Sequence, residues 1–191
     1  TGANVESGTV NITGDADLGT EAAGVLIGAI NIDVANTDTA NMTAVVNIGG
    51  NVVGHTTFDQ GATAQTITIN INGSADQSYT GTIDSDGGAG EGTLNITKAT
   101  GTATFANNIG ATEALLLIDA TTAASTAVFN GTVSAVTIDS AGTMTFDGVV
   151  TATALNIQTA AEATFTGRIV ETASSTSKLD LIGATTVTVG F

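Results

Sequence analysis

Short apolar strands separated by small-residue turns recur through the second half of the chain, in two alternating motifs. The first motif is an aromatic residue, a turn and a branched residue; its copies are "YTGTI" from Tyr79, "FANNI" from Phe105, "FNGTV" from Phe129, "FDGVV" from Phe146 and "FTGRI" from Phe165. The second motif is an apolar strand that closes on a small residue; its copies are "LNITKA" from Leu94, "LLLIDA" from Leu115, "VTIDSA" from Val136, "LNIQTA" from Leu155 and "LDLIGA" from Leu179. Copies of the second motif start 21, 21, 19 and 24 residues apart. Such a period is typical of strand-repeat folds.

The motifs predict which side chains are buried. Side chains alternate between the two faces of a strand, so Phe129 and Val133 of one copy point inward together. We expect the aromatic residues to be buried and stacked in register: Phe105, Phe129, Phe146 and Phe165. We expect the same of the third residues of the second motif: Ile96, Leu117, Ile138, Ile157 and Leu181.

The first half of the chain carries the same kind of pattern less regularly. Thr66–Asn72 alternates strictly and predicts a strand. The segment "VVNIGGNVVG" indicates two strands across a Gly-Gly turn, and Phe58 lies in a weak copy of the aromatic motif. A helix over Leu18–Ile30 is the alternative to strands there, although its glycines weaken it. We therefore expect one all-β domain over 1–191, irregular over 1–78 and regular over 79–191.

Composition narrows the fold class. The chain is 42% hydrophobic but has six Phe, one Tyr, and no Trp, Pro or Cys. Ala, Val, Ile and Leu must therefore fill the interior, which suits a narrow core. The pattern predicts an all-β fold, a β-helix or related strand-repeat solenoid. The alternative is a jelly-roll-type β-sandwich with strand exchange.

Charge excludes several partners. The chain holds 18 Asp and Glu against three Lys and Arg, with a net charge of -15. We expect no nucleic acid partner and no docking on anionic lipid, because the basic residues that contact phosphates are lacking. No apolar run reaches the length of a transmembrane helix, so we expect no membrane insertion.

Acidic turns are candidate cation sites, with calcium as the candidate cofactor. Asp84, Asp86 and Glu91 lie in "DSDGGAGEG", where oxygen ligands share a glycine-rich loop, as Ca²⁺ prefers. Asp15 and Asp17 form a weaker version in "GDADLG". A solvated turn is the alternative at both places, because the EF-hand spacing is not met.

Nothing in the sequence indicates an enzyme. His55 is the single imidazole, no "GxSxG" motif precedes a helix, and a surface turn residue is our interpretation of His55. Aromatic platforms for sugars are lacking as well. Asn-x-Ser/Thr triplets are candidate glycosylation sites: Asn11, Asn41, Asn72, Asn95 and Asn130.

The phrases "TATF", "FNGTV", "ATALNIQTA" and "ATFTGRIVETA" resemble the strand-repeat regions of large bacterial surface proteins. These families include autotransporter passengers, filamentous-haemagglutinin-like adhesins and strand-repeat surface-layer proteins. The resemblance covers residues 79–191 well and the first half weakly. It implies secretion to the cell surface or the extracellular space, β-helical architecture, and a role in adhesion or surface assembly.

The two ends of the chain indicate self-association. Both are strand-like, apolar and free of Pro and Lys, the residues that commonly protect edge strands. We expect head-to-tail contacts through Val10 and Ile12 at one end and Val187, Val189 and Phe191 at the other. The predicted function is a non-enzymatic building block of an extracellular filament, sheath or surface layer. The alternative is the stalk of a surface adhesin that contacts a glycan or a host surface.

Overall fold

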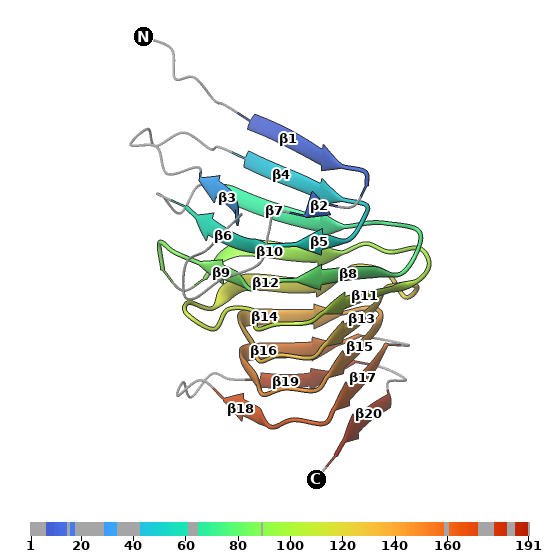
Figure 1. Cartoon of the computed structure of the whole chain (residues 1–191). Helices are drawn as coiled ribbons and strands as arrows, with labels where there is room; N and C mark the ends of the chain where they lie inside the picture. Colours follow the sequence, from blue (N-terminus) through green and yellow to red (C-terminus); the bar gives the residue numbers. More distant parts are fainter. Residues whose placement is uncertain are drawn as a thin grey trace.

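The computed structural model describes residues 7–14, 16–17, 29–33, 43–60, 65–88, 90–158, 161–171, 178–182 and 186–190. Within these ranges the chain is all-β and has no helix (Figure 1). All of the strand pairs formed there are parallel. The strands form stacked sheets, an arrangement consistent with a β-helix-like fold. A jelly roll consists of antiparallel strands, so the described strands do not form that alternative.

Three sheets make up the stack. Sheet A has nine strands: β1 (Ser7–Ile12), β4 (Thr43–Ile48), β7 (Thr66–Ile71), β10 (Glu91–Ile96), β12 (Leu115–Ala120), β14 (Val133–Ser140), β16 (Val150–Ile157), β18 (Ile169–Glu171) and β19 (Lys178–Leu181). Sheet B has eight: β2 (Ala16–Asp17), β5 (Val52–Val53), β8 (Gln77–Thr80), β11 (Thr102–Phe105), β13 (Thr126–Phe129), β15 (Thr143–Phe146), β17 (Glu162–Phe165) and β20 (Thr186–Val189). Sheet C has three: β3 (Ala29–Asp33), β6 (His55–Asp59) and β9 (Ile83–Ser85).

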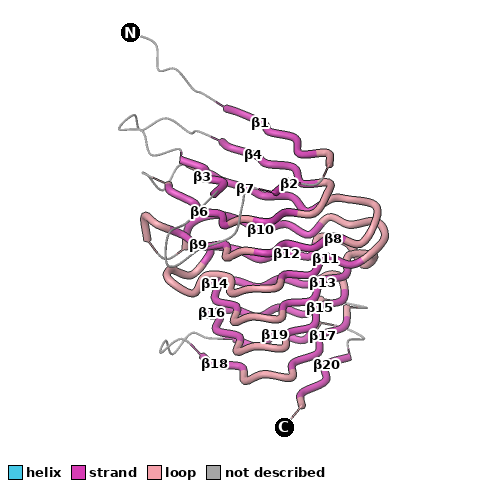
Figure 2. The backbone as a smooth tube through the Cα atoms, in the orientation of Figure 1, coloured by secondary structure: helices cyan, strands magenta, loops and turns pink. Residues whose placement is uncertain are grey.

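The chain passes through the sheets in turn, and we call one such passage a rung. Early rungs visit sheets A, B and C, as β4, β5 and β6 do. Later rungs lose the separate strand of sheet C. There, Ile109 bridges Ile83 on one side and Val133 on the other, and Val133 already begins β14 of sheet A. Where the connections are described, loops and turns join the sides of a rung (Figure 2).

The aromatic motif forms a column of stacked rings inside sheet B. Phe105, Phe129, Phe146 and Phe165 are buried and paired in register, which confirms the prediction for these four. Centroids of neighbouring Phe rings lie 4.9–5.0 Å apart, with planes within 8° of parallel. Tyr79 begins the column, 6.1 Å from Phe105. Ring pairs of this kind add about 0.5–1.5 kcal/mol each to the burial of their surface.

The glycine of the aromatic motif is required by close backbone contact. A Cβ on Gly148 would lie 2.2 Å from the Gly131 carbonyl oxygen, and one on Gly167 would lie 2.1 Å from the Gly148 oxygen. Neighbouring rungs therefore touch at this turn, and any side chain there would separate them.

The predicted register of the second motif is wrong in the middle rungs. Leu94 pairs with Ile118 rather than Leu115, and Leu117 lies half-buried on the outer face. Ile96 shares its column with Ala120, Ser140, Ile157 and Leu181, whereas Ile138 belongs to the column of Leu94. The run of three leucines in "LLLIDA" fits several registers equally well, so hydrophobicity alone does not fix the pairing.

One expectation for the first half also needs correction. Phe58 is buried in β6 of sheet C and is not part of the aromatic column, where Val52 pairs with Tyr79 instead. The two strands predicted around the Gly-Gly turn are present as β4 and β5, and they belong to different sheets. The helix considered over Leu18–Ile30 falls mostly outside the described residues, and its last two residues belong to β3.

Phe146→Ala should lower the free energy of unfolding by about 3–5 kcal/mol, because it opens a cavity between two stacked rings. Urea denaturation at neutral pH measures the loss. Phe146→Leu is the matched control, since it keeps most of the volume and should cost clearly less. Equal effects of the two variants would contradict a stack that depends on the ring.

Candidate functional site

A column of polar side chains runs along the outer face of sheet A. Each member lies between two inward-facing residues of its strand, as half-buried Asn47 does between buried Val46 and Ile48. Strand pairing brings the members side by side through the stack: Asn11, Asn47, Asn70, Asn95, Asp119, Asp139, Asn156 and Asp180. We call this column the amide–carboxylate ladder.

The amide part of the ladder has a direction. Asn47 donates its Nδ2 to Oδ1 of Asn11 at 2.8 Å, and Asn70 donates to Asn47 at 2.8 Å. Asn95 continues the series by donating to Asn70 at 3.1 Å. Every donor therefore faces the N-terminal end of the stack and every acceptor faces the C-terminal end.

The series of hydrogen bonds along the ladder is interrupted where two carboxylates lie side by side. Asp119 and Asp139 occupy consecutive rungs, and a carboxylate cannot donate a hydrogen bond to its neighbour. Burial raises the pKa of Asp119, and the charge of Asp139 raises it further. Asp139 receives a compensating hydrogen bond from Gln158 Nε2 at 2.6 Å. Next to it, a surface hollow is lined by Asp139, Asn156, Gln158, Asp180 and Ile182.

The predicted calcium residues over 84–91 do not converge. Asp84 Oδ1 accepts a hydrogen bond from the Thr112 backbone N–H at 2.9 Å, and burial raises the pKa of this carboxyl. Glu91 Oε2 accepts one from the Gln60 backbone N–H at 3.0 Å, and Asp86 is exposed. Both carboxylates thus fasten neighbouring loops.

The second predicted calcium site lies largely beyond what the structure describes. Asp15 is outside the described residues, and Asp17 belongs to β2. In the described ranges no three His, Cys, Asp or Glu side chains are placed to hold a metal ion. The calcium hypothesis therefore stays a prediction from the sequence.

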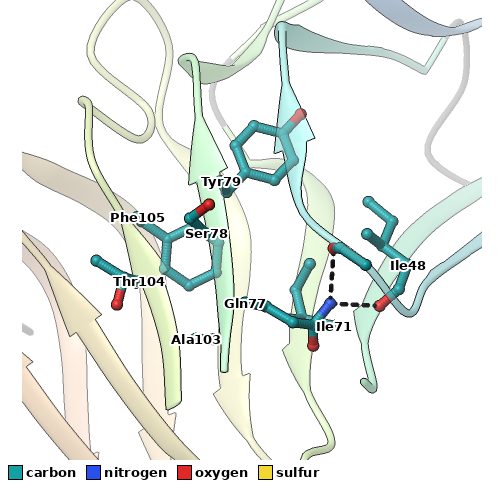
Figure 3. Close-up of a pocket in the computed structure, with 9 residues that line it drawn as sticks. Ile48, Ile71, Gln77, Ser78, Tyr79, Ala103, Thr104 and Phe105 are labelled. Carbon is teal, nitrogen blue, oxygen red and sulfur yellow. Dashed lines mark hydrogen bonds between the residues drawn. The ribbon is translucent and has the colours of Figure 1, made fainter. Parts of the chain in front are cut away.

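A buried lysine closes the corner between sheets A and B. The ammonium of Lys98 donates to the carbonyl oxygens of Gly73 at 2.8 Å and Ala75 at 2.7 Å, and to Gln77 Oε1 at 2.9 Å. Burial lowers the pKa of Lys98, while the charge of Asp76 opposes that shift. Gln77 in turn donates to the carbonyls of Ile48 and Gly50 (Figure 3). The network gives donors to the Gly50, Gly73 and Ala75 carbonyls of the turns, whereas the Ile48 carbonyl also accepts from the Asn72 backbone N–H at 3.1 Å.

Beside Gln77 lies a cavity of about 10 Å³ next to Tyr79 and Phe105. That is roughly the space of one water molecule, so it is too small for a substrate.

His55 is buried in β6, so the prediction of a surface turn residue is wrong. Its Nδ1 accepts a hydrogen bond from the Thr82 backbone N–H at 3.1 Å, which places the ring proton of the neutral imidazole on Nε2. Nδ1 also lies 2.8 Å from the Thr82 hydroxyl. Nearby, burial raises the pKa of Tyr79 to about 12, although its hydroxyl bonds Thr56. The side chains of His55 and Tyr79 are thus both held by hydrogen bonds within the fold.

The candidate glycosylation sites differ in accessibility. Asn72 and Asn130 are exposed just beyond the ends of β7 and β13, and Asn11 is exposed on β1. Asn95 is half-buried and uses its Nδ2 within the ladder. Asn41 lies outside the described residues. Asn11, Asn72 and Asn130 therefore present exposed side chains, whereas that of Asn95 is half-buried.

The predicted assembly residues lie in two different sheets. Val10 and Ile12 belong to β1 of sheet A, whereas Val187 and Val189 belong to β20 of sheet B. Val10 and Val189 are exposed, and Ile12 and Val187 are partly buried against the core. Phe191 lies outside the described residues. Exposed apolar residues also include Leu179 and Leu181 of β19, which the sequence prediction did not include.

Apolar periodicity does not reveal the ladder, because the members of the ladder are polar. The signal that finds it is an Asn or Asp between two inward-facing residues, as in "VNI" from Val10, "INI" from Ile69 and "LDL" from Leu179. This signal also gives the correct register for "LLLIDA", by aligning Asp119 with Asn95.

No helix within the described ranges is long and apolar enough to cross a membrane. Comparisons of the chain with family models, curated proteins and solved structures find no match.

Asp119→Asn should raise the free energy of unfolding at pH 7 by about 0.5–1 kcal/mol, because the amide can donate along the ladder. The pKa of Asp119 is raised in the folded protein, so the protonated carboxyl favours the folded state. This contribution to the free energy of unfolding is complete below the pKa of the unfolded chain and is lost as the pH rises through the folded pKa. The gain from the substitution should therefore shrink as the pH falls toward about 4.

Urea denaturation of both proteins across that pH range measures the effect. Asp86→Asn controls for the loss of one negative charge, since Asp86 is exposed and lies outside the ladder. An equal gain from both variants would assign the effect to net charge and contradict the role of the ladder.

Proposed function

We propose that the chain is a non-enzymatic structural protein, a secreted building block of an extracellular filament, sheath or surface layer. In this proposal the fold is a β-helix-type solenoid whose copies join head to tail through their end strands. The resemblance to bacterial surface-protein repeats supports the location at the cell surface or in the extracellular space. The observation that carries the proposal is the exposure of core columns at both ends of the stack.

Those columns are buried everywhere between the ends. Leu94, Ile118, Ile138 and Leu155 are at most 3% exposed, whereas Leu179 in the same column is 53% exposed and Val10 is 56% exposed. Leu181 is 51% exposed in a column where Ile157 is fully buried. Covering such residues with another rung releases apolar surface from water, at about 25 cal/mol per Å². A second copy supplies that rung.

The alternative is the stalk of a surface adhesin, in which further rungs of a longer chain cover the same columns. The regular stack from Tyr79 onward favours this second candidate equally, because a spacer needs the same repeating rungs. Contact with a glycan or a host surface would then belong to another part of such an adhesin. The two candidates differ in what the purified chain does on its own.

A building block should form ordered polymers as its concentration rises, whereas a stalk should stay monomeric and elongated. Electron microscopy and sedimentation velocity distinguish the two outcomes. Leu179→Lys with Leu181→Lys should raise the concentration needed for assembly by more than about tenfold, because charge at an edge strand opposes pairing and the apolar burial is lost. Leu116→Lys is the matched control, since Leu116 is 44% exposed but lies in the middle of the stack.

Polymers that form equally well with lysine at positions 179 and 181 would contradict head-to-tail contact through this end. Strictly monomeric wild-type protein would favour the stalk.

A further inference from the structure

Both ends of sheet A present the same columns in the same order. Val10 and Leu179 are the first and last members of one inward column, and Ile12 and Leu181 are those of the next. Asn11 of the amide–carboxylate ladder lies between Val10 and Ile12 at one end, and Asp180 lies between Leu179 and Leu181 at the other. The two end strands therefore match residue for residue.

The ladder gives these ends opposite hydrogen-bonding character. Oδ1 of Asn11 already accepts from Asn47, so the Nδ2 donor of Asn11 faces away from β4, toward the open side of β1. Asp180 is a carboxylate and, when ionised, only accepts hydrogen bonds. A donor at one end and a charged acceptor at the other are complementary, and hydrogen bonds to charged groups are the stronger kind.

We propose that β1 of a second copy pairs in parallel with β19, with Asn11 donating to Asp180 across the junction. Val10 then covers Leu179, and Ile12 covers Leu181. This inference rests on the proposed self-assembly and specifies its register. It also proposes a partner for β1 that differs from the one predicted from the sequence. Because β20 belongs to sheet B, its continuation in the next copy is the sheet B strand β2.

The other two end-to-end arrangements are disfavoured. Two N-terminal ends would bring the Asn11 donors face to face, and two C-terminal ends would bring the Asp180 carboxylates together. A twofold axis normal to the sheet would also make two β1 strands antiparallel, whereas the described strands pair in parallel, and an axis along the strands would turn their inward faces to opposite sides. Only the head-to-tail contact preserves both the direction of the ladder and the strand direction. Such a contact is heterologous and produces open filaments.

Single-cysteine cross-linking tests the register, because the natural chain has no cysteine. Neighbouring strands lie about 4.8 Å apart, within the Cα separation that a disulfide spans. Val10→Cys protein mixed with Leu179→Cys protein should give a disulfide-linked dimer under mild oxidation. Val10→Cys mixed with Val189→Cys is the matched control and should give none above background, because Val189 is a similarly exposed residue of sheet B.

Preferential linkage of Val10→Cys to Val189→Cys, or to itself, would overturn the proposed register while leaving self-assembly intact. A wild-type protein that never assembles would instead overturn the proposed function, and the register with it.

Exchange of the ladder residues provides an independent test. Asn11→Asp keeps the acceptor for Asn47 but places a carboxylate opposite Asp180, so assembly should weaken by at least about tenfold. Adding Asp180→Asn restores one donor to the junction and should recover most of the loss. Asn130→Asp at an exposed turn controls for added charge. Normal assembly of Asn11→Asp, or no recovery in the double variant, would overturn the Asn11–Asp180 contact.

Discussion

Parallel strand pairing fixes the distance between rungs at about 4.8 Å, and the rest of the structure depends on that spacing. Each residue is held beside its counterpart in the next rung, so a side chain must be able to pack against the residue at the same position of the neighbouring strand. Phenyl rings fit this requirement, since their centroids lie 4.9–5.0 Å apart along the column. Asparagine fits it too, because one amide both donates to and accepts from its neighbours. Glycine fits it at the turns where the backbones touch.

Carboxylates fit such a column poorly. Asp119 beside Asp139 brings like charges together in a half-buried position, and the raised pKa of Asp119 reflects both burial and repulsion. Further along, Asn156 separates Asp139 from Asp180, and Gln158 supplies Asp139 with a donor. The ladder thus tolerates a short acidic stretch where amides lie close by. The buried ammonium of Lys98 is likewise compensated by neighbouring polar groups, because carbonyl oxygens accept its hydrogen bonds.

Much of the fold could be predicted from the sequence, because the recurring aromatic residues show which positions of successive strands lie side by side. The spacing of the four Phe residues was enough to place them in one buried stack. The second motif was harder to place, since Leu115, Leu116 and Leu117 satisfy an apolar pattern in several registers. Phe58 was misplaced because a ring in isolation does not reveal which sheet it belongs to. His55 was wrongly placed at the surface, because its partner Thr82 lies in a neighbouring rung. The partners of Lys98, two backbone carbonyls and the Gln77 side chain, also come from a neighbouring rung.

A stack of this kind has no inherent end, because the chemistry of its last rung is that of its middle rungs. What distinguishes the ends from the sides is the apolar surface that Val10, Leu179 and Leu181 expose there. Exposed carboxylates such as Asp76, Asp86 and Asp147 lie around the turns, and the net charge of -15 makes copies repel when they approach sideways. The inward columns at the ends are uncharged and apolar. In the proposed assembly, lateral repulsion would favour growth along the stack, and the direction of the amide ladder would distinguish one end from the other.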